Sequence, residues 1–157
     1  MSKHEMSKHE KYMEECNIIS KESQDTTKVG CIIVTIDDTV LRGYNGMMGL
    51  VTKERLEKPL KYKWIEHAER SAIYEAAFAG VSLYNATAYV NWFPCVDCCR
   101  AIIRSGIRTL VSPELPDFQH HKWDFKIVFQ MLKEEDITVI FLDGSDFNVT
   151  FKYLFNK

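Results

Sequence analysis

The chain has 157 residues, enough for one domain with a sizeable core, and its 46% hydrophobic and 27% charged residues are typical of a globular protein. A net charge of −2 and a pI of about 6.2 argue against a polynucleotide partner, because proteins that bind nucleic acids usually carry a basic face. No apolar run approaches the ~18 residues that a transmembrane helix needs, and the polar start is unlike a signal peptide. We therefore expect a cytoplasmic protein without membrane contact, in which the five cysteines stay reduced.

The first ten residues contain the same five-residue segment twice, at Met1–Glu5 and again at Met6–Glu10. Such a repeat is typical of a duplicated chain start, whether artificial or native, and we leave it out of the fold prediction. We expect residues 1–10 to be a leader that is disordered or of artificial origin, and residues 11–157 to form a single domain.

The periodicity of apolar residues predicts alternating helices and strands along the rest of the chain. In chain order we expect a helix at 10–23, strands at 29–36 and 40–45, a helix at 64–79, a strand at 87–92, a helix at 96–105, a strand at 107–111, a helix at 123–135 and a strand at 137–142. The first two strands form a hairpin. The later alternation predicts right-handed crossovers in a mainly parallel sheet with helices on both faces.

Two segments do not fit this alternation. Residues 46–63 contain two glycines, a proline and five positive charges: Lys53, Arg55, Lys58, Lys61 and Lys63. A solvated surface loop and a loop in which one or two charges face a phosphate are both open interpretations. The tail from Phe147 onward is too apolar for disorder, so we expect it to pack on the domain or on another subunit.

A pair of cysteines three positions apart, Cys95 and Cys98, lies where a strand is expected to end and a helix to begin. This spacing is typical of half a zinc site, and His67 upstream can supply a third ligand. Three protein ligands leave a fourth position for water, as in catalytic zinc sites, and Glu69 can carry protons. A His-x-Glu followed by Pro-Cys-x-x-Cys is the pattern of zinc deaminases that act on nucleobases.

Each half of this pattern also has an ordinary explanation. The cysteine pair alone could be a redox motif, and the histidine alone could be a plain helix start. A closed structural zinc site with Cys99 as fourth ligand is a further alternative. Adjacent residues on a helix point ~100° apart, so we expect Cys99 to face the core while Cys98 faces the metal.

The residues just before Cys95 are aromatic. We expect Trp92 and Phe93 to form walls of a base pocket, because aromatic faces stack on bases. A role in the core alone is the alternative for both. A single phosphate would need few donors, and the candidates are Lys28, Lys53, Arg55 and Lys61.

With these motifs, the chain resembles the cytidine deaminase superfamily, and within it the deoxycytidylate (dCMP) deaminase family, over about residues 12–142. The segments that carry the resemblance are His67-Ala68-Glu69, Phe93-Pro94-Cys95 with Asp97-Cys98, Lys28-Val29-Gly30, Gly43-Tyr44-Asn45-Gly46 and Ser105-Gly106-Ile107. The resemblance implies an α/β fold, a three-layer α/β/α sandwich with a five-stranded mixed sheet. It also implies a zinc cofactor, conversion of dCMP to dUMP and ammonia for thymidylate synthesis, and a contact of Asn45 with the sugar or base.

The resemblance further implies a homo-oligomer, either a dimer or a hexamer. Regulated members, which dCTP activates and dTTP inhibits, usually have a proline two residues after the Gly-Tyr-Asn-Gly segment. Met47-Met48-Gly49 stands here instead, which weakens the expectation of regulation by dCTP or dTTP. Ser71 also stands where the family commonly has asparagine.

Two alternative functions stay open. One is the deamination of a modified nucleotide or of a base in tRNA or another RNA, against which the near-neutral charge counts. The other is a non-catalytic zinc module, against which Glu69 counts because a purely structural site has no need of it.

Overall fold

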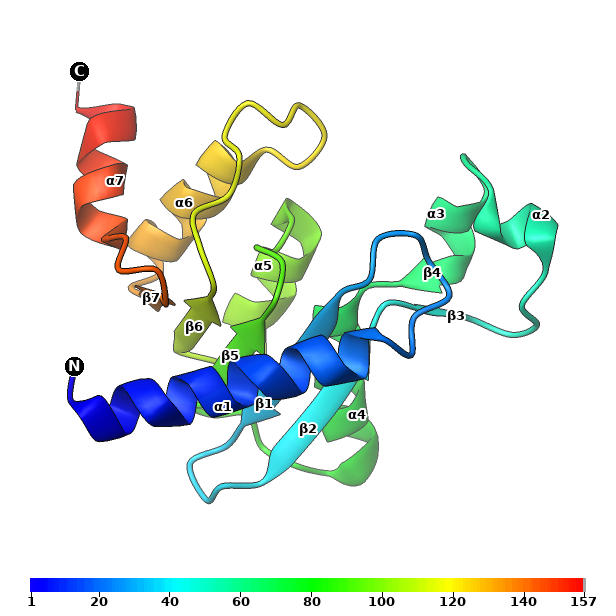
Figure 1. The fold of residues 1–157 in the computed structure, drawn as a ribbon, viewed down its shortest axis with the longest axis horizontal. Coiled ribbons are helices and arrows are strands. Elements are labelled where there is room, and N and C mark those ends of the chain that lie inside the picture. Colours follow the sequence, from blue (N-terminus) through cyan, green and yellow to red (C-terminus); the bar gives the residue numbers. More distant parts are fainter. Residues whose placement is uncertain (157) are drawn as a thin grey trace.

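The computed structural model describes residues 1–156 and contains one five-stranded sheet with the strand order β2-β1-β5-β6-β7 (Figure 1). Its strands are β1 (Gly30–Val34), β2 (Val40–Tyr44), β5 (Thr87–Val90), β6 (Thr109–Ser112) and β7 (Thr138–Phe141). Strand β1 pairs antiparallel with both β2 and β5, whereas β5, β6 and β7 run parallel. The sheet is therefore mixed, as the resemblance implied, and only its second half is parallel.

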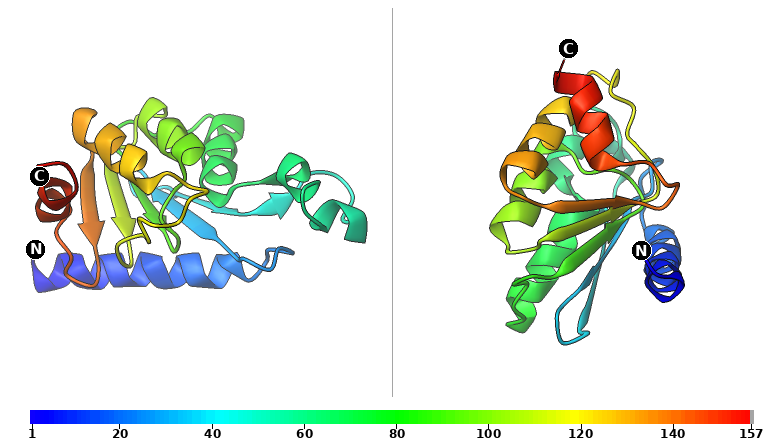
Figure 2. Two further views of the ribbon diagram at one scale, coloured as in Figure 1. Left: turned by 90° about the horizontal axis from the view of Figure 1, so that it is seen from above. Right: turned by 90° about the vertical axis from the view of Figure 1, so that its left-hand side faces the viewer.

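Helices cover both faces of this sheet, which confirms the three-layer sandwich. They are α1 (Lys3–Ser20), α4 (Ala68–Ala79), α5 (Val96–Arg104), α6 (Phe125–Glu134) and α7 (Phe147–Phe155). Figure 2 shows α1 on one face and α4, α5 and α6 on the other. The larger core lies under the second group, and a smaller one joins Tyr12 and Cys16 of α1 to Ile32 and Tyr89 of the sheet.

The N-terminal repeat differs from the disordered leader that we expected. Helix α1 begins at Lys3, and a capping box closes its first turn: Glu5 N–H donates to the Ser2 hydroxyl (3.1 Å), and Ser2 N–H donates to the Glu5 carboxylate (2.8 Å). These bonds satisfy two backbone groups that would otherwise lack partners. The repeat also reaches the sheet, where His9 Nδ1 lies 2.9 Å from the Tyr89 hydroxyl.

The segment before the metal motif is also more structured than the loop that we expected. It contains β3 (Gly46–Met47), α2 (Lys53–Leu56), α3 (Lys61–Trp64) and β4 (Ile65–Glu66). Because β4 pairs antiparallel with β3, the helix predicted at 64–79 begins only at Ala68. This small sheet with α2 and α3 lies at the opposite end of the molecule from α7 (Figure 1).

Two other expectations concern the C-terminal part. Helix α6 begins at Phe125 rather than Trp123, because Asp124 has a left-handed backbone (φ 48°) that stops the helix from extending backward. The apolar tail forms α7, whose Phe147 is buried against Phe129 with ring centroids 4.7 Å apart. The tail therefore packs on its own domain, one of the two arrangements expected. None of the helices within residues 1–156 is long and apolar enough to cross a membrane.

A close backbone approach sets the position of α4 on the sheet. A Cβ atom at Gly43 of β2 would lie 2.3 Å from the Ala68 carbonyl oxygen and 2.5 Å from the Ala72 backbone nitrogen. Both are backbone atoms of α4, which cannot move aside as a flexible side chain could. Glycine at this position therefore lets the strand lie directly against the first turns of the helix.

We predict that Gly43→Ala lowers the free energy of unfolding by about 3 kcal/mol, at the upper end of the usual cost of overpacking. Urea unfolding followed by circular dichroism measures this. Gly80→Ala is the matched control, because no atom of residues 1–156 lies within 4 Å of its added Cβ and the left-handed backbone at φ 69° is what opposes alanine. We expect this control to cost about 1 kcal/mol. Equal losses in the two variants would contradict the steric explanation.

Candidate metal centre and active-site pocket

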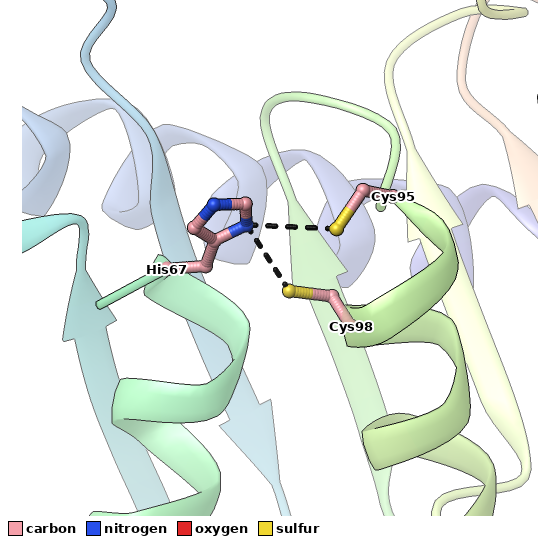
Figure 3. A group of neighbouring side chains, drawn as sticks. All are labelled: His67, Cys95 and Cys98. Atoms are coloured by element: carbon pink, nitrogen blue, oxygen red, sulfur yellow. Dashed lines mark hydrogen bonds between the residues drawn. The ribbon is translucent and has the colours of Figure 1, made fainter. Parts of the chain in front are cut away.

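Three side chains converge where α4 and α5 begin. His67 is the N-cap of α4, Cys95 is the N-cap of α5, and Cys98 lies in the first turn of α5. His67 Nδ1 lies 3.6 Å from Cys95 Sγ and 3.4 Å from Cys98 Sγ, and all three ligand atoms lie within 4.8 Å of one another (Figure 3).

These distances fit a tetrahedral zinc ion. Zinc–sulfur bonds of about 2.3 Å and zinc–nitrogen bonds of about 2.0 Å place the two donor atoms about 3.5 Å apart at the tetrahedral angle. One imidazole nitrogen and two sulfurs are also the donor types that zinc prefers. The residues present therefore fit the cofactor that the sequence predicted, with three protein ligands.

The electrostatics of the group favour a cation. A hydrogen bond from Cys98 lowers the pKa of the Cys95 thiol to about 4, although burial by itself would raise it. His67 contributes further to the lowering. Cys95 and burial in turn raise the pKa of Cys98, so without a metal the pair carries one thiolate. The hydrogen bond to Cys95 also raises the pKa of His67, although burial by itself would lower it. Metal binding would release the remaining protons, as it does at thiolate sites in general.

Glu69 lines the same pocket as His67 and Cys95 and lies in the first turn of α4. Its side chain is buried, with 3% of the residue exposed, and this burial raises the pKa of its carboxyl group. A buried carboxyl group beside a metal site can both accept and donate a proton. The structure therefore places the predicted proton carrier beside the predicted metal ligands.

A network of polar contacts connects the two halves of the metal group. The Glu66 carboxylate accepts hydrogen bonds from the His67 N–H (2.9 Å) and from Arg70 Nε (2.6 Å). The other side of the Arg70 guanidinium lies 4.0 Å from the carboxylate of Asp97, in the first turn of α5. Sequence reasoning missed this link, although the spacing of Glu66 and Arg70 by four residues is a recognisable pattern on helices.

The pocket above the metal group has a volume of about 290 Å³, close to the lower end of small-molecule sites at ~300 Å³. Its walls come from several distant parts of the chain. They comprise Asp25, Thr27, Val29, Asn45, Lys58, Lys61, Tyr62, Ile65, His67, Ala68, Glu69, Trp92, Phe93, Cys95, His120, Lys122 and Trp123.

Three of the four predicted substrate contacts line this pocket. Trp92 is 48% exposed, whereas Phe93 is buried and also packs on Phe125 with ring centroids 5.8 Å apart. Asn45 is buried, and its amide accepts from Val29 N–H (2.9 Å) and donates to the Thr27 carbonyl (2.7 Å). Asn45 therefore holds the pocket wall in place, and its contact with a substrate stays a prediction.

Lys28 does not line the pocket. Its side chain is exposed, and its ammonium group donates to the Ser23 carbonyl. Among the charges of residues 46–63, Lys58 and Lys61 do line it. Arg55 instead stacks on Trp64, with the guanidinium carbon 3.7 Å from the ring centroid.

Cys99 is completely buried in the core and lies outside the ligand group, which confirms its predicted direction. The pocket residues that sequence reasoning missed include Asp25, Tyr62, His120, Lys122 and Trp123. These residues belong to no recognisable motif.

Comparison with known proteins places this geometry in context. Residues 6–113 match the family model described as the cytidine and deoxycytidylate deaminase zinc-binding region. The chain is 32% identical over 121 residues to a probable deoxycytidylate deaminase of Caenorhabditis elegans, covering 72% of this chain and 60% of the relative. It is 48% identical over 58 residues to the deoxycytidylate deaminase of Enterobacteria phage T4, covering 37% of this chain and 30% of the relative. The chain thus spans 60% of the nematode protein and 30% of the phage protein, less than two thirds of either.

The fold matches solved structures over most of the chain. The dCMP deaminase of cyanophage S-TIM5 in its apo form aligns with a TM-score of 0.69 and 22% identity, covering 89% of this chain and 98% of that one. The same enzyme in complex with dCMP and dUMP gives a TM-score of 0.67 at 22% identity, covering 88% and 97% of the two chains. At this identity the likeness shows a shared fold.

We predict that Cys95→Ala and Cys98→Ala each weaken zinc affinity by more than about 100-fold. This exceeds the usual loss in metal affinity when a residue that only hydrogen-bonds to a ligand is mutated. Each variant removes one of three ligands. Competition with a chromogenic chelator measures the affinity. The control is Cys99→Ala, which should keep the affinity of the unchanged protein and lose only about 1 kcal/mol of stability. Loss of zinc from the Cys99 variant would favour the closed structural site.

Proposed function

The chain belongs to the cytidine and deoxycytidylate deaminase family, and we propose that it hydrolyses the exocyclic amine of a cytosine nucleotide, converting dCMP to dUMP and ammonia. The observation that carries this proposal is the buried Glu69, which lines one pocket with His67 and Cys95, the two residues that form the candidate metal group together with Cys98. The name of the nematode relative, a probable deoxycytidylate deaminase, supports the choice of substrate. A supply of dUMP for thymidylate synthesis follows from the proposed product.

His67, Cys95 and Cys98 would hold the zinc ion at the floor of the pocket. When bound, zinc would lower the pKa of a water molecule toward ~7, so that a nucleophile is available near neutral pH. The N-termini of α4 and α5 both point at this place and favour the negative charge of the thiolates.

Glu69 moves the protons in this proposal. Its carboxylate takes a proton from the attacking water and passes it to the ring nitrogen N3, while the water oxygen bonds to C4. The second water proton then passes through Glu69 to the amine, and the bond between C4 and nitrogen breaks to release ammonia. The sum is one water consumed and one ammonia formed, with no change in oxidation state.

The aromatic residues and Asn45 hold the base in this scheme. Trp92 and Phe93 line the pocket beside Cys95 and offer apolar faces to a flat ring. Phe93 is anchored by its packing on Phe129 and Phe141, with ring centroids 5.6 Å and 6.0 Å away, so its position is set before substrate binds. A rigid wall lowers the entropy cost of holding the base near Glu69.

We predict that zinc-loaded protein deaminates dCMP in preference to CMP, deoxycytidine and deoxyadenosine monophosphate, with release of ammonia. Chromatography of each reaction measures the products. If none of the four is converted by protein that holds one zinc per chain, the proposed substrate is wrong, and modified nucleotides and RNA become the next candidates.

We predict that Glu69→Gln keeps zinc bound but lowers kcat for dCMP by about 10²- to 10⁴-fold, the usual contribution of a general acid and base. Glutamine has the same shape and cannot carry the proton. Initial rates and metal content are measured on the same sample. A parallel loss of zinc would show that Glu69 serves the metal rather than the proton transfer.

A further inference from the structure

The mouth of the pocket lies between two segments that are far apart in the sequence. One runs from Lys58 into α3, which contains Tyr62, and the other is the loop before α6 with Lys122 and Trp123. Lys122 joins them, because its Nζ lies 3.5 Å from the centroid of the Tyr62 ring and 4.3 Å from that of Trp123. Such cation–π contacts hold an ammonium group in place without neutralising its charge.

A second ammonium group approaches the same tyrosine. Lys122 and, less strongly, Lys58 lower the pKa of the Tyr62 hydroxyl through hydrogen bonding and charge. Both lysines therefore act on one hydroxyl at the pocket mouth. The third lysine of the pocket differs, because Lys61 is paired with the Asp25 carboxylate at 2.9 Å.

The charge at this mouth is unbalanced. Within residues 1–156, neither Lys58 nor Lys122 has a carboxylate oxygen within 4.0 Å of its ammonium group. Two like charges brought to one place repel each other, and an anion bound between them removes this cost. Lysine ammonium groups bind phosphate as point charges, and a phenol hydroxyl can donate a further hydrogen bond.

We propose that Lys58, Lys122 and the Tyr62 hydroxyl bind the phosphate of the substrate, so that the pocket selects a nucleotide over the corresponding nucleoside. This inference rests on the proposed function, since the base of the same molecule would reach Glu69 at the pocket floor. Phosphate binding would exchange the contact of Lys122 with the aromatic rings for a charged hydrogen bond. Lys61, already neutralised by Asp25, contributes little to this selection.

The test compares two ligands that differ only by the phosphate. Isothermal titration of zinc-loaded protein with dUMP and with deoxyuridine gives the ratio of their affinities. In Lys58→Met and in Lys122→Met we expect this ratio to fall about tenfold, the usual effect of one hydrogen bond to a charged group. Inorganic phosphate should compete with dUMP in the unchanged protein and lose affinity by a similar factor in both variants.

The controls separate charge from shape. Lys58→Arg and Lys122→Arg keep the positive charge, so the preference for dUMP over deoxyuridine should stay close to that of the unchanged protein. Lys53→Met removes a charge from α2, away from the pocket wall, and should leave the ratio unchanged. Thermal melting checks that each variant folds. An unchanged ratio in both Lys58→Met and Lys122→Met would overturn the proposed phosphate site.

The outcome also separates this inference from the proposed function. If the protein deaminates dCMP but the ratio of its affinities for dUMP and deoxyuridine is the same in both lysine variants as in the unchanged protein, the reaction is supported and the phosphate site is refuted. If neither dUMP nor deoxyuridine binds, but inorganic phosphate binds through Lys58 and Lys122, the anion site stands and the cytosine nucleotide is the wrong substrate.

Discussion

The contact between β2 and the start of α4 is the constraint on which the rest of the site depends. Gly43 has no side chain, so the strand lies against the backbone of Ala68 and Ala72. His67 and Glu69 flank Ala68, and this packing therefore determines where the histidine ligand and the proposed proton carrier lie. The cysteines are positioned separately, by the end of β5 and by the packing of Phe93 in the core. The metal group forms only because both helices begin at the same edge of the sheet (Figure 3).

Charge is divided between the floor and the mouth of the pocket. The floor collects thiols and a buried carboxyl group at two helix N-termini, where a cation stabilises the negative charge. At the mouth, neither Lys58 nor Lys122 is paired with a carboxylate of residues 1–156, while Asp25 neutralises Lys61. This division suits a ligand with a neutral ring at one end and an anionic group at the other. Both proposals depend on this separation of charge along a single pocket.

Local patterns in the sequence predicted most of the elements, and the errors have physical causes. Helix α4 begins later than expected because residues 65–66 pair with residues 46–47, and such long-range pairing leaves no local periodicity. In the N-terminal repeat, Ser2 and Glu5 have the spacing of a capping box, so the start of α1 can be recognised in the sequence itself. The small sheet with α2 and α3 was unpredictable, because its elements are too short to show a period.

The sequence by itself predicted that His67, Cys95 and Cys98 come together with Glu69 beside them, because each half of the motif is short and its spacing brings it to a helix start. Helix geometry also determined that Cys99 faces the core. Only the tertiary structure decided which lysines face the pocket. From the sequence, Lys28 was named as a phosphate donor and Lys58 was only one of five positive charges in residues 46–63. In the structure the ammonium group of Lys28 turns to the Ser23 carbonyl, whereas Lys58 lines the pocket. Lys58, Tyr62 and Lys122 belong to no motif and meet only when the chain is folded. The direction of a long, flexible side chain depends on the surfaces packed around it, and no local spacing records those surfaces.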